Sequence, residues 1–173
     1  MNVTVLEFPF LTSTSLFLKE HYRSLPSWTF IRTDFQSHGY GQHGHVWESV
    51  QGENLLFSLL VKPTKVVNLE VLKQQLIKAC VDFFHHIKVF PTFKEPNDFY
   101  INDDKLCGLL METKSEKELF SYIIIGIGLN VNQTLFPNLK ATSLKNILKK
   151  RWDISALFNQ FTEMLKDNLT GLG

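Results

Sequence analysis

The stretch 119–132 limits the possible folds more than any other part of the chain, because three consecutive isoleucines lie within a run that is almost wholly apolar. Consecutive β-branched residues favour a strand over a helix. An apolar run without alternation is typical of a strand that is covered on both faces. Asn54–Val61 is a second run of this kind. The sequence therefore predicts a sheet whose central strands are buried between two layers of other elements.

Two glycines, Gly126 and Gly128, interrupt the first of these strands. Residues two apart lie on the same face of a strand, so one face lacks side chains at this point. Such a face leaves room for a ligand or for the close approach of another backbone. The side-chain amides of Asn130 and Asn132 follow just beyond it. Two interpretations stay open here, a binding site and a helix packed tightly against the strand.

Four helices are expected. Apolar residues between Leu69 and Phe83 recur at steps of three and four, which predicts an amphipathic helix on the sheet, ending near His85. Hydroxyl residues 12–15 precede an apolar segment and predict a helix N-terminus, because their oxygens accept hydrogen bonds from first-turn amides. The segment 141–150 is expected to be helical and to lead to a last helix.

Lys94 stands out among the lysines. A strand at 87–93 is expected to lead to it, and a turn at 96–98 and a hairpin at 99–111 are expected to follow. A lysine at a strand end beside a proline-stiffened turn has a fixed position, and a compact ammonium held there can draw two anions together. The alternative is a surface lysine, since most lysines are exposed.

The composition is that of one globular domain. A chain of 173 residues with 44% hydrophobic and 20% charged residues is long enough for one core and argues against disorder. The net charge of +1 predicts no nucleic-acid or membrane partner. The N-terminus does not resemble a signal peptide, and no apolar run has membrane-spanning length, so the cytoplasm is expected. Cys80 and Cys107 lie in apolar patterns and are predicted to be buried free thiols of a reducing compartment.

A glycine-rich loop, 36–47, is the second candidate for a binding element. Three glycines within six residues let the backbone take unusual conformations and bring its amides close to a bound group. A mobile surface loop is the alternative. Its three histidines, His38, His43 and His45, have no carboxylate or cysteine among them, so no metal site is predicted.

Several of these motifs together resemble biotin–protein ligases. The resemblance runs in order from Phe10 to about Leu169 and is carried by Gln36 with Gly39-x-Gly41-x-x-Gly44-x-x-Trp47, Asn54-Leu55, Lys94-x-Pro96-Asn97-Asp98, Gly108-x-Leu110-x-Glu112 and Gly126-x-Gly128-x-Asn130-Val131-Asn132. It implies an α+β fold, a mixed β-sheet flanked by helices, related to class II aminoacyl-tRNA synthetases and lipoate ligases. Residues 1–173 are then expected to be a single catalytic domain, with neither an N-terminal DNA-binding domain nor a C-terminal β-barrel domain.

The resemblance also implies an activity. Biotin and MgATP would give biotinyl-5′-adenylate and pyrophosphate, and a lysine of a biotin carboxyl carrier protein, such as that of acetyl-CoA carboxylase, would then take the biotin. ATP and Mg²⁺ would serve as co-substrate, no tightly bound cofactor is expected, and a homodimer is left open. Two alternatives remain, a lipoate or octanoyl ligase or transferase on the same scaffold and a degenerate biotin-binding module.

The same resemblance assigns roles to residues of this chain. It implies that Lys94 is catalytic, at the point where the biotin carboxylate meets the phosphate. The residues expected to bind biotin are Ser13, Thr14, Gln36, Gly39, Tyr40, Gly41, Gln42, Lys94, Gly108 and Gly126. Those expected to bind the nucleotide or the adenylate are His43, Gly44, His45, Trp47, Asn97, Asp98, Gly128 and Asn130.

The chain departs from the family pattern in the glycine-rich loop. Family members usually carry arginines between the loop glycines, where this chain has Tyr40, Gln42, His43 and His45. Arginine grips phosphate with a charged fork, whereas tyrosine and glutamine offer only neutral donors. We therefore expect the adenylate to be held loosely, with protonated His43 or His45 replacing part of the missing charge.

Overall fold

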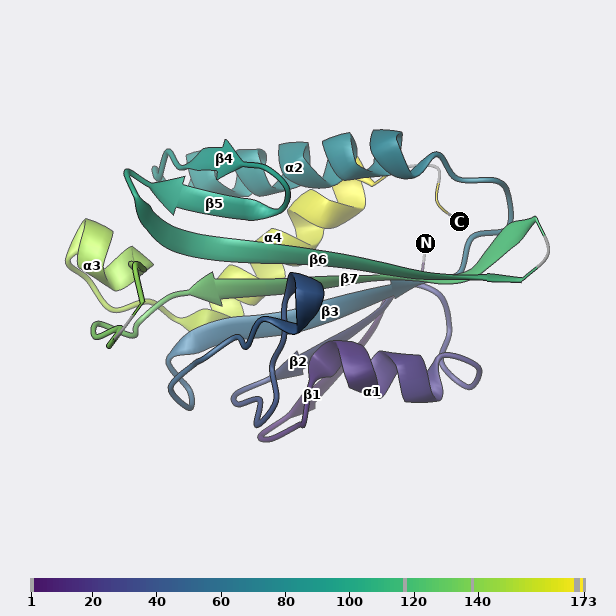
Figure 1. Ribbon diagram of the computed structural model, residues 1–173, viewed down its shortest axis with the longest axis horizontal. Helices are drawn as coiled ribbons and strands as arrows, with labels where there is room; N and C mark the ends of the chain where they lie inside the picture. Colours follow the sequence, from purple (N-terminus) through teal and green to yellow (C-terminus); the bar gives the residue numbers. More distant parts are fainter. Residues whose placement is uncertain (1, 117, 138, 170–171, 173) are drawn as a thin grey trace.

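The computed structural model describes residues 2–116, 118–137, 139–169 and 172 (Figure 1). The described residues form one seven-stranded sheet in the order β1-β2-β3-β7-β6-β5-β4. Only the β1–β2 pair is parallel, so the sheet is mixed, as predicted. The strands are β1 (Thr4–Phe8), β2 (Thr29–Thr33), β3 (Asn54–Val61), β4 (Thr92–Lys94), β5 (Asp98–Ile101), β6 (Asp104–Glu116) and β7 (Leu119–Asn130).

Helices cover both faces of the sheet. The long helices α2 (Leu69–His86) and α4 (Ile154–Asn168) share the main apolar core with one face, and α1 (Thr14–His21) packs on the other face (Figure 1). The Ser13 hydroxyl accepts a hydrogen bond from the Leu16 N–H and caps α1, as the hydroxyl pattern predicts. The short elements α3 (Leu144–Leu148) and η1 (Gln42–Gly44) complete the described helices. None of the helices in the described part of the chain is both long and apolar enough to cross a membrane.

The two apolar runs are the buried strands that the sequence predicts. Every residue of β3 is buried, and the three consecutive isoleucines of β7, Ile123 to Ile125, are fully buried. The two strands are antiparallel neighbours, with Ser58 opposite Gly126. One face of β3 and β7 therefore packs against the phenylalanine-rich core under α2 and α4, and the other face is free to line a site near α1.

Two predicted elements are shorter in the structure. The strand expected at 87–93 exists only as β4, because Ile87 ends α2 and Lys88 takes a left-handed backbone conformation with φ of 62°. The helical segment expected at 141–150 is reduced to α3, which ends where Lys149 also turns left-handed at φ 57°. The hairpin at 99–111 is confirmed, and its second strand continues to Glu116.

A bulge in this hairpin decides which β6 residues share a face. Phe99 pairs with Cys107 and Tyr100 pairs with Lys105, so Leu106 has no partner on β5. The extra residue shifts the alternation by one position. Lys105 and Gly108 therefore lie on the same face of the sheet, and Cys107 packs into the core on the other face.

The two cysteines give a direct test of this core. Both Cys80 and Cys107 are free and fully buried, as the sequence predicts, and burial raises the pKa of both thiols. Because the thiolate is the reactive form, we expect neither cysteine to react with a disulfide reagent in the folded protein. Both should react in guanidinium chloride, as measured by the absorbance of the released aromatic thiol. Rapid reaction of either cysteine without denaturant would contradict the described packing.

Candidate active site

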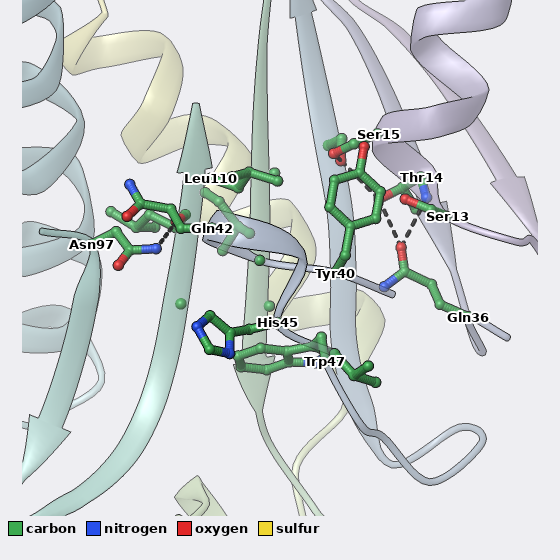
Figure 2. A pocket seen from close by; sticks show the side chains of 18 of the residues that line it. Ser13, Thr14, Ser15, Gln36, Tyr40, Gln42, His45, Trp47, Asn97 and Leu110 are labelled. Atoms are coloured by element: carbon green, nitrogen blue, oxygen red, sulfur yellow. Dashed lines mark hydrogen bonds between the residues drawn. The ribbon is translucent and has the colours of Figure 1, made fainter. Parts of the chain in front are cut away.

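A cavity of about 200 Å³ lies between the N-terminus of α1, strands β3, β7 and β6, and the glycine-rich loop (Figure 2). It therefore opens on the sheet face that α1 covers. Its lining residues are Ser13, Thr14, Ser15, Gln36, Tyr40, Gly41, Gln42, His45, Val46, Trp47, Phe57, Ser58, Asn97, Asp98, Lys105, Gly108, Leu109, Leu110, Gly126, Ile127 and Gly128.

Neutral hydrogen-bonding groups gather at the α1 end of the cavity. The backbone N–H and the hydroxyl of Thr14 donate to Gln36 Oε1 at 2.8 Å and 3.1 Å. The Ser58 hydroxyl shares hydrogen bonds with Thr14 Oγ1 at 2.7 Å and with Ser15 Oγ at 2.9 Å. These hydroxyls are buried, so the network is fixed in position, and the Gln36 Nε2 amide donates to no residue within the described ranges. This end of the cavity can exchange neutral hydrogen bonds with a polar ligand.

Gly126 and Gly128 form part of the cavity floor, and each is approached closely. A Cβ at Gly126 would lie 2.9 Å from Ser15 Oγ, and a Cβ at Gly128 would lie 2.6 Å from Trp47 Cε2. The Trp47 indole therefore lies flat against the strand, where its Nε1 is buried without a hydrogen-bond partner among the described residues. The cleared face that the sequence predicts is thus shared between the cavity and the two side chains that pack against it.

The glycine-rich loop folds back on itself beside the cavity. The Gly41 N–H donates to the His45 carbonyl at 2.7 Å, and the Trp47 N–H donates to the Gly39 carbonyl at 2.8 Å. Figure 2 shows Tyr40 directed toward the α1 end and Trp47 lying at the other side of the site. Both His43 and His45 are exposed, and of the two only His45 lines the cavity. Within residues 2–116, 118–137, 139–169 and 172, no group of three or more His, Cys, Asp or Glu is placed to hold a metal ion.

Lys105 is the lysine that reaches the cavity. Its Nζ lies 2.8 Å from Asp98 Oδ1 and 5.3 Å from the centre of the Trp47 ring. An ammonium has three donors, so the ion pair with Asp98 leaves Lys105 able to bind a ligand as well. The backbone of Lys105 is fixed on both sides, since its N–H donates to the Lys140 carbonyl and its carbonyl accepts from Thr142. A cation is therefore held at a defined place in the cavity wall.

The structure does not bring Lys94 to this cavity, which departs from the sequence prediction. Lys94 ends the edge strand β4, and β5 separates it from β6. Its side chain is 45% exposed, pairs with Asp103 at 3.3 Å and lies 4.5 Å from the centre of the Tyr100 ring. Lys94 thus has the surroundings of a surface lysine, the alternative that the sequence left open.

Most of the other residues predicted for the site line the cavity or lie beside it. Asn97 Nδ2 donates to the Leu109 carbonyl at 2.7 Å and ties the turn to β6, and Asn130 Nδ2 donates to the Lys105 carbonyl at 3.3 Å. The predicted residues that line the cavity are Ser13, Thr14, Gln36, Tyr40, Gly41, Gln42, His45, Trp47, Asn97, Asp98, Gly108, Gly126 and Gly128. Those that do not are Gly39, His43, Gly44, Lys94 and Asn130.

Three polar lining residues were missed from the sequence, Ser15, Ser58 and Lys105. Ser58 is the single hydroxyl in the apolar run of β3, and its position opposite Gly126 on the neighbouring strand was a usable signal. Lys105 lies within the hairpin predicted at 99–111, and no role was predicted for it. Its spacing of three residues before Gly108 reveals a shared face only when the bulge at Leu106 is known.

Comparisons with known proteins identify the family of the chain. The model of the biotin/lipoate A/B protein ligase family matches residues 7–130, which is more than half of the chain and includes every cavity-lining residue. The chain belongs to the biotin/lipoate A/B protein ligase family. Among curated relatives of this ligase family, the bifunctional ligase/repressor BirA of Bacillus subtilis is 34% identical over 126 residues, covering 70% of this chain and 38% of that protein. BirA of Escherichia coli is 29% identical, over 74% of this chain and 40% of its own length.

Solved structures of ligases share the fold. The biotin protein ligase of Aquifex aeolicus in complex with biotin and ATP superposes with a TM-score of 0.84 at 30% identity, covering 96% of this chain and 70% of that one. The biotin protein ligase of Leishmania major in complex with biotin has a TM-score of 0.74 at 22% identity. The α+β fold of a biotin–lipoate ligase is therefore confirmed. The chain spans less than half the length of the BirA proteins that it matches.

Proposed function

We propose that this chain is an ATP-dependent biotin–protein ligase, which forms biotinyl-5′-adenylate and transfers biotin to a lysine of a carrier protein. The observation that carries the proposal is the cavity itself. It has neutral hydrogen-bonding groups at one end, Lys105 in its wall, and a floor of glycines beneath Trp47. The similarity to the Aquifex aeolicus ligase, whose structure contains biotin and ATP, supports the same assignment.

The groups along the cavity match the parts of biotin in the order in which they occur in that molecule. The ureido ring offers two N–H donors and one carbonyl acceptor, which suit the hydroxyl and amide groups of Thr14, Ser58 and Gln36. The apolar side chain of Leu110, which lies opposite Gly126 on the cavity face of the sheet, can contact the thioether ring and the aliphatic chain. The carboxylate would then point toward Lys105, the cation of the cavity wall.

Lys105 is the residue that we propose for the role predicted for Lys94. In the first step a carboxylate oxygen attacks the α-phosphorus of ATP, and pyrophosphate leaves. Two anions must meet, so a fixed ammonium between them stabilises the charge that concentrates in the transition state. In the second step the amine of the carrier lysine attacks the acyl carbon, and AMP leaves. Trp47, His45 and Gly128 would lie on the nucleotide side, with Mg²⁺ arriving as part of MgATP.

The partner and the compartment are parts of the same proposal. A biotin carboxyl carrier protein of acetyl-CoA carboxylase, or of a related carboxylase, is the acceptor that fits a biotin ligase. Two buried free thiols suit a reducing compartment such as the cytoplasm.

Biotin-dependent exchange of radioactive pyrophosphate into ATP tests the proposed function. We expect exchange with biotin and little with lipoate or octanoate, because the hydroxyl–amide end of the cavity would be left unpaired by an acid without a ureido group. Exchange that depends on lipoate or octanoate would identify a ligase of the other branch. Absence of exchange with every acid would leave a degenerate binding module and would contradict the proposal.

A further inference from the structure

Within the described chain, a single hydrogen bond joins residues 39–47 of the glycine-rich loop to residues outside the loop. Tyr40 Oη donates to Glu112 Oε2 of β6 at 3.2 Å. The other hydrogen bonds of residues 39–47 that the structure describes connect the loop to itself. The loop also packs on the sheet through the Trp47 indole, which lies against Gly128 and near Lys105.

Glu112 is itself held in place by helix α1. Lys19 Nζ donates to Glu112 Oε1 at 2.6 Å, and the two side chains are 30% and 22% exposed. The same ammonium lies 5.4 Å from the centre of the Tyr40 ring. The carboxylate therefore bridges two groups, a cation on α1 and a phenol on the loop. Glu112 does not line the cavity, whereas Tyr40 does.

The protonation of these groups suits the arrangement. Burial raises the pKa of Tyr40, so its hydroxyl keeps the proton that it donates at neutral pH. Burial by itself would lower the pKa of Lys19, but the hydrogen bond to Glu112 and the nearby Tyr40 outweigh it and raise that pKa. A neutral phenol and a charged ammonium thus face one carboxylate, and a hydrogen bond to a charged acceptor is stronger than one between neutral groups.

We propose that Tyr40, Glu112 and Lys19 form a latch that holds loop 39–47 closed over the cavity. Tyr40 and Glu112 are then positioning residues, which act by keeping Trp47 and Gln42 against the bound ligand. The identity of the ligand under the closed loop rests on the proposed function, whereas the latch itself does not. Residues 39–47 contain no arginine that could hold the loop closed by binding a phosphate group of the ligand. The latch holds the loop closed through contacts within the protein instead.

Hydrogen exchange measured by mass spectrometry tests the latch without any ligand. In Tyr40→Phe we expect the peptide covering residues 36–48 to exchange about tenfold faster than in the unmodified protein, because the loop loses a hydrogen bond to a charged group. Glu112→Ala should have the same effect, and Glu112→Gln a smaller one, because glutamine keeps an acceptor oxygen for Tyr40. Tyr22→Phe is the matched control, since its hydroxyl contacts Arg23 and Lys114 on the surface, away from the cavity. Equal exchange of the loop in Tyr40→Phe and the unmodified protein would overturn the latch.

The same variants connect the latch to the ligand. In pyrophosphate exchange, Tyr40→Phe should raise the KM for biotin about tenfold and change kcat less than about twofold, because closure of the loop favours bound substrate and transition state alike. Tyr22→Phe should leave both parameters unchanged. Faster hydrogen exchange of the loop in Tyr40→Phe, with an unchanged KM for biotin, would show that the latch has no role in substrate binding and would overturn that part of the proposal. Absence of biotin-dependent exchange in the unmodified protein would overturn the proposed function instead, and the hydrogen-exchange result would still decide the latch.

Discussion

Lys105→Gln is expected to lower the rate of biotin-dependent pyrophosphate exchange by at least about 100-fold, the effect of removing a preorganised group that stabilises transition-state charge. Lys105 supplies the cation of the cavity wall, and its ion pair with Asp98 and its fixed backbone hold it there. Glutamine leaves Asp98 a neutral donor, so the carboxylate is not stranded without a partner. We expect a kcat effect, since the charge acts mainly when the two anions meet.

Lys94→Gln is the matched control for this experiment. Lys94 lies outside the cavity on the edge strand, and its contacts with Asp103 and Tyr100 are partly exposed. Exposed ion pairs contribute little to stability, so the variant should fold and retain nearly full exchange activity. Circular dichroism and thermal unfolding establish that both variants are folded. Loss of exchange in Lys94→Gln with activity retained in Lys105→Gln would restore the prediction from the sequence and contradict the assignment to Lys105.

Gly128→Ala is expected to displace the Trp47 indole and to lower the free energy of unfolding by about 1–3 kcal/mol, the usual cost of overpacking. The added Cβ would lie 2.6 Å from Trp47 Cε2 and 2.8 Å from Cζ2, and a rigid ring cannot absorb both contacts by bending. The rate of biotin-dependent pyrophosphate exchange should also fall, because the indole would be pushed into the cavity. Guanidinium unfolding and the exchange assay measure the two effects.

A double variant separates this collision from other effects of the glycine. In a Trp47→Ala background the Cβ at position 128 meets no indole, so Gly128→Ala should cost little there, and the two single changes should couple strongly. Additive effects on the free energy of unfolding would mean that Trp47 does not lie against Gly128.

The fold could be predicted from the sequence wherever periodicity was strong. The steps of three and four between Leu69 and Phe83 located α2, and the apolar run Asn54–Val61 gave β3 with its observed bounds. The ends of the helices were less predictable. Lys88, just after α2, and Lys149, just after α3, take a left-handed backbone conformation that no residue pattern predicted.

The site could be predicted in outline, and its cation could not. The glycine-rich loop, the hydroxyls at the start of α1 and the glycines of β7 converge on one cavity, as their pattern indicated. Lys105 was missed because strict alternation from Leu109 and Cys107 would turn it into the core, and the bulge at Leu106 reverses that direction. The bond between Tyr40 and Glu112 joins residues 72 positions apart, a contact that only the folded chain reveals.

A crystal structure of this protein with biotin and a non-hydrolysable ATP analogue is the most direct test of how the cavity works. We expect the ureido ring beside Thr14 and Gln36, and we expect the biotin carboxylate and the α-phosphate both within about 3.2 Å of Lys105 Nζ, the range of a hydrogen bond. A carboxylate that contacts Lys94, or a biotin bound outside this cavity, would contradict the proposed site.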